Sequence, residues 1–138
     1  DDLILDIGPA MGYSTAILAT MCEAVVMLER SELVQGCDVI FSELGLDNII
    51  TSSGSLTEGV PEHAPYEGIF IQLAIDFFPS DLEEQLKQGG KVLAVFNHDG
   101  VKQCYSGLKT TEGMSWSYEF DANVAHLSEF KTNVGFNF

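Results

Sequence analysis

Basic side chains are scarce in this sequence. The 138 residues contain six lysines and arginines against 21 aspartates and glutamates, which gives a formal charge of -15 and an isoelectric point near 4.2. Such an excess of acid repels phosphate backbones and anionic lipid surfaces. We therefore expect neither nucleic acids nor membrane surfaces among the partners.

Long apolar runs and leader signals are also lacking. The longest nearly apolar stretch, residues 16–28, has 13 residues and is interrupted by Thr20 and Glu23. A helix that spans a membrane needs about 20 apolar residues, so no transmembrane helix is expected. The sequence begins with Asp1 and Asp2, without Met or a basic leader, and we expect it to lack part of its natural N-terminus.

Cysteine and histidine are few and widely spaced. Cys22, Cys37 and Cys104 form no C-x-x-C pair, and no two of the cysteines and histidines have the spacing of metal ligands. Unpaired cysteines of this kind are typical of a reducing compartment. We therefore expect a cytoplasmic protein without disulfides or a bound metal.

No repeat, low-complexity run or flexible linker divides the sequence. Hydrophobic residues make up 46% of it and include nine phenylalanines, which excludes a disordered acidic tail. Length and composition together predict one compact domain over residues 1–138.

Strand and helix patterns alternate along the first two thirds of the chain. Short apolar runs predict strands that are covered on both faces of a parallel sheet, and amphipathic segments predict helices. The expected strands cover residues 3–7, 24–28, 49–52, 68–73 and 92–96, and the expected helices cover residues 13–22 and 32–44. The form S-x-x-E at Ser80 and Glu83 is a capping box, and it predicts a further helix that ends at Gly89 and Gly90.

The pattern changes after residue 96. A turn sequence and two strand-like segments, residues 101–109 and 114–120, predict an antiparallel hairpin, and residues 134–138 have a weaker strand pattern. The whole series predicts an α/β fold with an open, doubly wound, mainly parallel sheet of the Rossmann-like kind and an antiparallel C-terminal hairpin.

The segment Asp6-Ile7-Gly8-Pro9-Ala10-Met11-Gly12-Tyr13-Ser14 joins the first strand to the first helix. At this junction of a doubly wound sheet, backbone N–H groups meet a nucleotide-like ligand and glycines allow its close approach. The dinucleotide fingerprint requires glycine at positions 8, 10 and 13, and only Gly8 fulfils it. The phosphate-binding G-x-x-x-x-G-K-[ST] loop is absent as well.

A different pattern fits this segment, namely acid-x-G-x-[GA]-x-G, filled by Asp6, Gly8, Ala10 and Gly12. It is followed by Glu29 at the end of the second predicted strand. An acid about 20 residues beyond the loop can accept hydrogen bonds from both hydroxyls of a ribose. The two features together predict an adenosyl ligand without a pyrophosphate.

These features resemble those of the Rossmann-like S-adenosylmethionine-dependent methyltransferases, and more narrowly the protein-L-isoaspartate (D-aspartate) O-methyltransferase family. The blocks that carry the resemblance follow in order: residues 6–16, Leu28-Glu29-Arg30, residues 64–69, Pro79 and residues 85–92. The resemblance implies that S-adenosylmethionine is the methyl donor and that the acceptor is a carboxylate of a damaged, isoaspartyl protein. That carboxylate is already ionised at neutral pH, so the implied in-line displacement needs no general base.

The resemblance also assigns donor contacts. The loop residues would border the methionine and ribose moieties above a supporting Asp6, Glu29 would hold the ribose hydroxyls, and Gln72 and Leu73 would close the fourth strand near the methyl donor. The complete expected donor site is Asp6, Gly8, Pro9, Ala10, Gly12, Tyr13, Ser14, Glu29, Arg30, Gly54, Ser55, Leu56 and Gln72, with residues 54–56 beside the adenine. No catalytic residue is assigned.

Three departures from the family pattern leave other functions open. Ser55 stands where the family often has an aspartate, Gln72 and Leu73 replace small residues, and the family's substrate loop lies upstream of the first strand. The alternatives are a non-catalytic interaction or oligomerisation module and a methyltransferase that acts on a small molecule. An exposed sheet edge would also permit pairing with a second copy of the chain.

Overall fold

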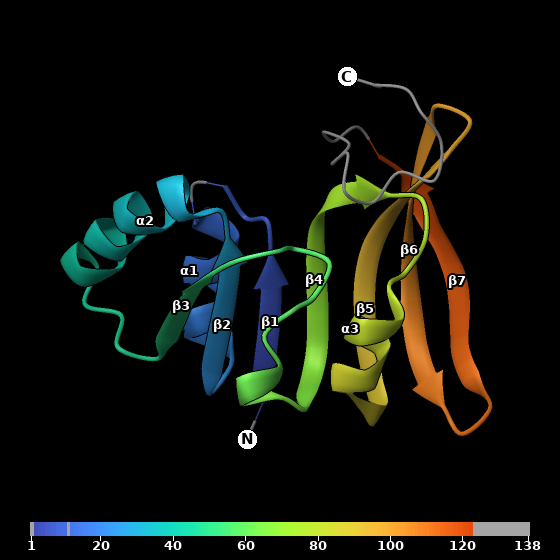
Figure 1. The fold of residues 1–138 in the computed structure, drawn as a ribbon, viewed down its shortest axis with the longest axis horizontal. Helices are drawn as coiled ribbons and strands as arrows, with labels where there is room; N and C mark the ends of the chain where they lie inside the picture. The colour runs from blue at the N-terminus through green and yellow to red at the C-terminus, as the bar shows by residue number, and fades with distance from the viewer. Residues whose placement is uncertain (1, 11, 123–138) are drawn as a thin grey trace.

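The computed structural model describes residues 2–10 and 12–122, which form a seven-stranded sheet in the order β3-β2-β1-β4-β5-β6-β7 (Figure 1). The strands are β1 (Leu3–Ile7), β2 (Ala24–Glu29), β3 (Ile49–Ser53), β4 (Tyr66–Ile75), β5 (Leu86–His98), β6 (Val101–Thr110) and β7 (Gly113–Asp121). The helices are α1 (Tyr13–Met21), α2 (Ser31–Glu43) and α3 (Ser80–Gln85), with a short 3-10 turn, η1 (Pro61–His63). The first five strands pair in parallel and the last two pair antiparallel, so the predicted fold class and the C-terminal hairpin are confirmed.

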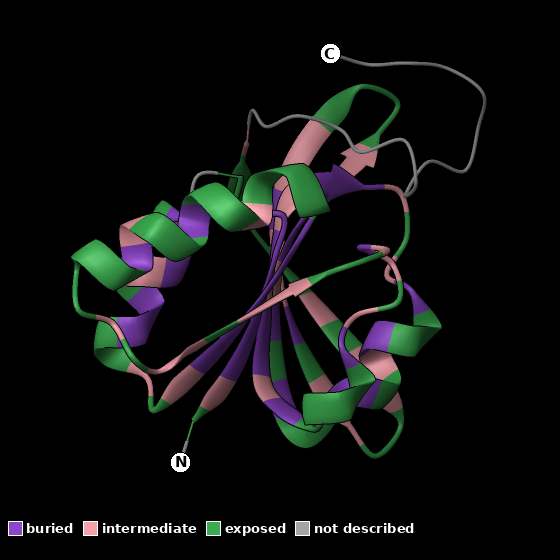
Figure 2. Cartoon of the chain, turned by 60° about the vertical axis from the view of Figure 1, so that its left-hand side comes forward, coloured by how far each residue is buried: buried purple, intermediate pink, exposed green. Residues whose placement is uncertain are grey.

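Two layers cover the sheet on opposite faces. Helices α1 and α2 lie on one face, and α3 and the connection from β3 to β4 lie on the other, with the buried strands between them (Figure 2). The strand order reverses between β1 and β4, because β1 leads outward to β2 while β4 leads the other way to β5. This reversal places the loop after β1 next to the end of β4, which is where open α/β sheets bind their ligands.

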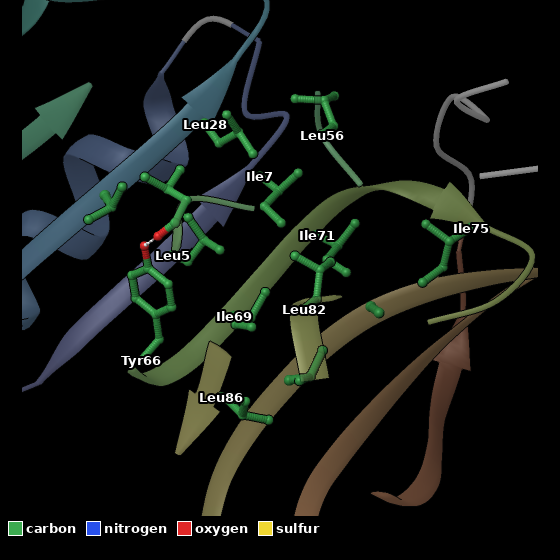
Figure 3. Close-up of a cluster of buried hydrophobic side chains, with 14 of the residues drawn as sticks. Leu5, Ile7, Leu28, Leu56, Tyr66, Ile69, Ile71, Ile75, Leu82 and Leu86 are labelled. Atoms are coloured by element: carbon green, nitrogen blue, oxygen red, sulfur yellow. Dashed lines mark hydrogen bonds between the residues drawn. The ribbon is translucent and has the colours of Figure 1, made fainter. Parts of the chain in front are cut away.

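The largest core cluster lies on the α3 face of the sheet. Leu5, Ile7 and Ile69 from β1 and β4 pack there with Leu82 from α3 (Figure 3). Tyr66 is fully buried at the start of β4, and its hydroxyl donates a hydrogen bond of 2.6 Å to the carbonyl of Val60. This bond fixes the end of the β3–β4 connection to the sheet.

The helix after Pro79 is shorter than the sequence predicts. It begins at Ser80, whose side chain forms no capping hydrogen bond, and it ends at Gln85 rather than at the predicted Gly89 and Gly90. The next residue, Leu86, already pairs with Tyr66 in the sheet. The predicted capping box is wrong because Pro79, and not Ser80, is the N-cap residue, and the predicted glycine stop is wrong because sheet pairing ends the helix earlier.

The two glycines have another place in the fold. Between the pairs Tyr66–Leu86 and Gly68–Lys91 the strand β5 contains extra residues, so Gly89 and Gly90 lie in an irregular part of β5, with Gly89 at φ 80°.

The C-terminal end of α3 is capped by Lys109 of β6 instead of by a glycine. Its ammonium donates hydrogen bonds to the carbonyls of Glu83 at 2.6 Å and Leu86 at 2.8 Å. A cation at the C-terminal end of a helix complements the helix dipole.

In the described part of the chain, none of the helices combines the length and the apolarity that crossing a membrane requires. The weak strand pattern at residues 134–138 lies outside the described residues.

Replacing Tyr66 with Phe tests the attachment of the β3–β4 connection. The variant loses a buried hydrogen bond while the ring still fills its place in the core, so we expect the free energy of unfolding to fall by about 1 kcal/mol. Urea unfolding of the variant against the wild type measures this loss. Tyr13→Phe is the matched control, because Tyr13 is 66% exposed, and an equal effect of the two substitutions would contradict the assignment.

Candidate functional site

The loop between β1 and α1 follows an unusual backbone path. Gly8, Ala10 and Gly12 have φ values of 70°, 58° and 82°, in the left-handed region that favours glycine. Gly12 is restricted by packing as well, since a Cβ there would lie 2.9 Å from the ring of Phe41 in α2. The first and third small residues of the sequence pattern are therefore required by conformation, and the third also by close contact with α2.

Asp6 lies under this loop with its side chain fully buried. The hydroxyls of Ser14 and Thr15 in the first turn of α1 both donate to its Oδ2 at 2.8 Å, and the Gln72 amide of β4 donates to its Oδ1 at 2.8 Å. Burial raises the pKa of the Asp6 carboxyl, the hydrogen bonds from Gln72, Ser14 and Thr15 act to lower it, and the charge of Glu29 raises it further. A single carboxylate thus connects β1, α1 and β4.

Glu29, at the end of β2, holds the loop from the side. Its Oε2 accepts the N–H of Ala10 at 2.7 Å and its Oε1 accepts the N–H of Arg30 at 2.8 Å, and the side chain is only 3% exposed. The contact with Ala10 holds that residue in its left-handed conformation. A carboxylate offers about four acceptor positions, so both oxygens retain capacity for ribose hydroxyls.

Several predicted donor-site residues come together around this loop. They either form hydrogen bonds with one another or lie in the loop itself: Asp6, Gly8, Ala10, Gly12, Ser14, Glu29 and Gln72. The hydroxyl of Ser14 is directed to Asp6 rather than outward. Pro9 is half-buried, while Tyr13 and Arg30 are exposed, Arg30 as the residue that precedes α2.

The three residues predicted beside the adenine lie in two different environments. Gly54 and Ser55 line an open cavity of about 520 Å³ between the end of β3 and α3, whose lining also includes the carboxylates of Glu58 and Glu84. Leu56 is 1% exposed and belongs to the main core, beside Ile7 and Leu28 (Figure 3). The adenine contacts stay a prediction.

Two supporting residues were not found from the sequence. Thr15 is fully buried and donates to Asp6, and Cys37 of α2 donates from its thiol to the carbonyl of Ala10 at 3.5 Å. The signal for Thr15 was present, since a buried acid needs several donors and Thr15 directly follows Ser14. The position of Cys37 depends on how α2 packs against the loop, and no local pattern shows it.

Within residues 2–10 and 12–122, no three His, Cys, Asp or Glu side chains are grouped so that they could hold a metal ion. Cys37 and Cys104 are buried and Cys22 is half-buried, all as free thiols.

The sequence matches the model of the Protein-L-isoaspartate(D-aspartate) O-methyltransferase (PCMT) family over residues 1–128. The chain belongs to this family. It is 37% identical to the protein-L-isoaspartate O-methyltransferase of Roseobacter denitrificans over 119 residues, which cover 83% of this chain and 55% of that protein. With its counterpart from Brucella anthropi it shares 37% identity over 91 residues, or 65% of this chain and 42% of the relative. The chain thus spans about half the length of the curated PCMT relatives that it matches.

Solved structures of the same family have the same fold. A protein-L-isoaspartate O-methyltransferase superposes with a TM-score of 0.87 at 26% identity, over 92% of this chain and 42% of the other. A putative PCMT from Plasmodium falciparum, solved in complex with S-adenosyl-L-homocysteine, has a TM-score of 0.79 at 19% identity, over 96% of this chain and 66% of the other. The resemblance drawn from the loop and from Glu29 is confirmed at the level of the family.

Replacing Asp6 with Asn tests whether the pKa of this buried acid is raised in the folded protein. Its pKa is raised above the ordinary value of 3.8, so the folded state holds the proton more tightly than the unfolded state. The free energy of unfolding of the wild type, relative to that of Asp6→Asn, should therefore fall as the pH rises from the ordinary pKa of an aspartate to the raised pKa of Asp6. Above the raised pKa it should stay constant.

Urea unfolding of both proteins from about pH 3 to about pH 8 measures this difference. Gln72→Leu removes one of the hydrogen bonds that lower the pKa of Asp6, so the same comparison made in the Gln72→Leu background should extend the upper end of this pH window to higher pH. A difference between wild type and Asp6→Asn that does not change with pH would show that the carboxyl is not perturbed.

Proposed function

We propose that this chain is the donor-binding core of an S-adenosylmethionine-dependent O-methyltransferase that methylates isoaspartyl carboxylates in damaged proteins. The observation that carries the proposal is the buried Glu29 carboxylate, 2.7 Å from the N–H of Ala10 in the left-handed loop after β1. Membership of the PCMT family supports the proposal, as does a neighbour solved with S-adenosyl-L-homocysteine.

The residues present fit an adenosyl donor. The loop contains glycine at both of its ends, and Ala10 between them is exposed, while Gly8 is buried and donates its N–H to the carbonyl of Leu28 at 2.9 Å. The pyrophosphate-binding fingerprint is absent, and Glu29 lies at the strand end where an acid accepts ribose hydroxyls. These features favour a nucleoside with one extended arm over a dinucleotide.

When bound, such a donor supplies an electrophilic methyl group on a sulfonium centre. An isoaspartyl carboxylate is ionised near neutral pH and can attack that carbon directly, which leaves a methyl ester and a neutral thioether. The protein therefore needs no general base, and its residues contribute position. Asp6 and Glu29 serve this purpose by fixing the loop between β1, β2, α1 and β4.

The two alternative functions differ in their products. A non-catalytic relative would bind the donor without forming an ester, and a small-molecule methyltransferase would bind it and leave isoaspartyl peptides unmodified. An assay of methyl ester formation on an isoaspartyl peptide, with the corresponding aspartyl peptide as control, distinguishes both from the proposed repair activity. Donor binding by the full-length protein without ester on the isoaspartyl peptide would reject the proposed acceptor.

Replacing Glu29 with Gln tests the donor site itself. Loss of the charged acceptor should weaken the affinity for S-adenosylmethionine and S-adenosylhomocysteine about tenfold, which corresponds to about 1.4 kcal/mol. Isothermal titration calorimetry measures both affinities. The matched control is Glu32→Gln, three residues further on the exposed side of α2, which should bind like the wild type. A folded wild-type protein that binds neither ligand would overturn the proposal.

A further inference from the structure

The strand β4 contains a bulge near its C-terminal end. Phe70 pairs with Leu93 of β5 and Ala74 pairs with Val95, so the three residues from 71 to 73 lie opposite the single residue Ala94. Bulges bend a strand and change the direction of its side chains, and they are frequent beside active sites. This one lies where β4 passes the loop after β1.

The bulge directs two consecutive side chains toward that loop. Gln72 donates to Asp6, as described above, and Leu73 lies against Gly8. A Cβ on Gly8 would be 3.0 Å from Cδ1 of Leu73 and 3.3 Å from its Cγ, and 3.8 Å from Cδ1 of Leu56. Two leucines therefore occupy the space beside Gly8, one of the glycines predicted to border the donor.

The two leucines differ in their freedom to move. Leu56 is 1% exposed and is surrounded by the main core. Leu73 is only partly buried at the margin of that cluster, so its side chain can turn without opening a cavity inside the protein.

We propose that Leu73 is a specificity-determining residue of the donor site, whose side chain closes the space over Gly8 and must turn away when the amino-acid arm of the donor enters. The inference rests on the proposed function. Leu73 thereby sets how strongly the site prefers a nucleoside with an amino-acid arm over the bare nucleoside. Shortening this side chain removes the need for displacement and should tighten binding of the full ligand alone.

The test compares S-adenosylhomocysteine with adenosine by calorimetry. Leu73→Val removes the Cδ1 atom that lies closest to Gly8 and keeps a branched side chain, and Leu73→Ala removes more. We expect both variants to bind S-adenosylhomocysteine about three- to tenfold more tightly than the wild type and to bind adenosine unchanged. If Leu73→Ala does not fold, as shown by its thermal unfolding, Leu73→Val decides.

Leu93→Ala is the matched control. Leu93 is also a half-buried leucine, on the neighbouring strand β5, but it packs with a separate cluster of Ala74, Val95 and Cys104. Its truncation should leave the affinity for S-adenosylhomocysteine unchanged. An equal gain in Leu93→Ala, or a gain for adenosine as large as that for S-adenosylhomocysteine, would indicate general loosening and overturn the proposal.

The remaining outcomes separate this inference from the proposed function. Wild-type binding with equal or weaker binding by both Leu73 variants leaves the proposed function in place and overturns the role of Leu73. If neither the wild type nor any folded variant binds, the proposed function and the inference are overturned together. If both Leu73 variants unfold, Leu73 is a core residue and the inference about its role in specificity is overturned.

Discussion

The need to satisfy a buried carboxylate organises this structure. Asp6 is fully buried at the end of β1, and its three donors among the described residues are uncharged. Burying a carboxylate is costly unless hydrogen bonds replace its water, so the donors must be held in place. They come from α1 and from β4, so one acid holds both elements together at the end of β1.

The path of the β1–α1 loop follows from that meeting. The loop has to leave β1 above Asp6 and enter α1 within a few residues, and it does so through three left-handed residues. Glycine adopts this conformation without strain, whereas Ala10 is held in it by a hydrogen bond from its N–H to Glu29. The strand order determines where the loop lies, since the reversal between β1 and β4 places it beside the end of β4.

Local patterns in the sequence predicted most of the fold and part of the site. The first strand was predicted with its bounds, and the loop and Glu29 were identified because small residues and an acid at fixed spacing reflect backbone conformation and strand ends. The helix after Pro79 was predicted too long, because the pairing of Leu86 with Tyr66 overrides a local stop signal. The contact of Gln72 with Asp6 joins residues 66 positions apart and depends on a bulge in β4, which the sequence does not show without the register of β5.

The hydrogen bond between Glu29 and Ala10 also links the loop thermodynamically to the proposed ligand site. The same carboxylate that would receive ribose hydroxyls already holds the backbone of the loop. Any ligand that draws on this acceptor changes the strength of the Ala10 contact, and any change in the loop changes the acceptor that the ligand meets. A ligand that binds Glu29 at the proposed site therefore acts on the backbone at Ala10 as well as on the carboxylate.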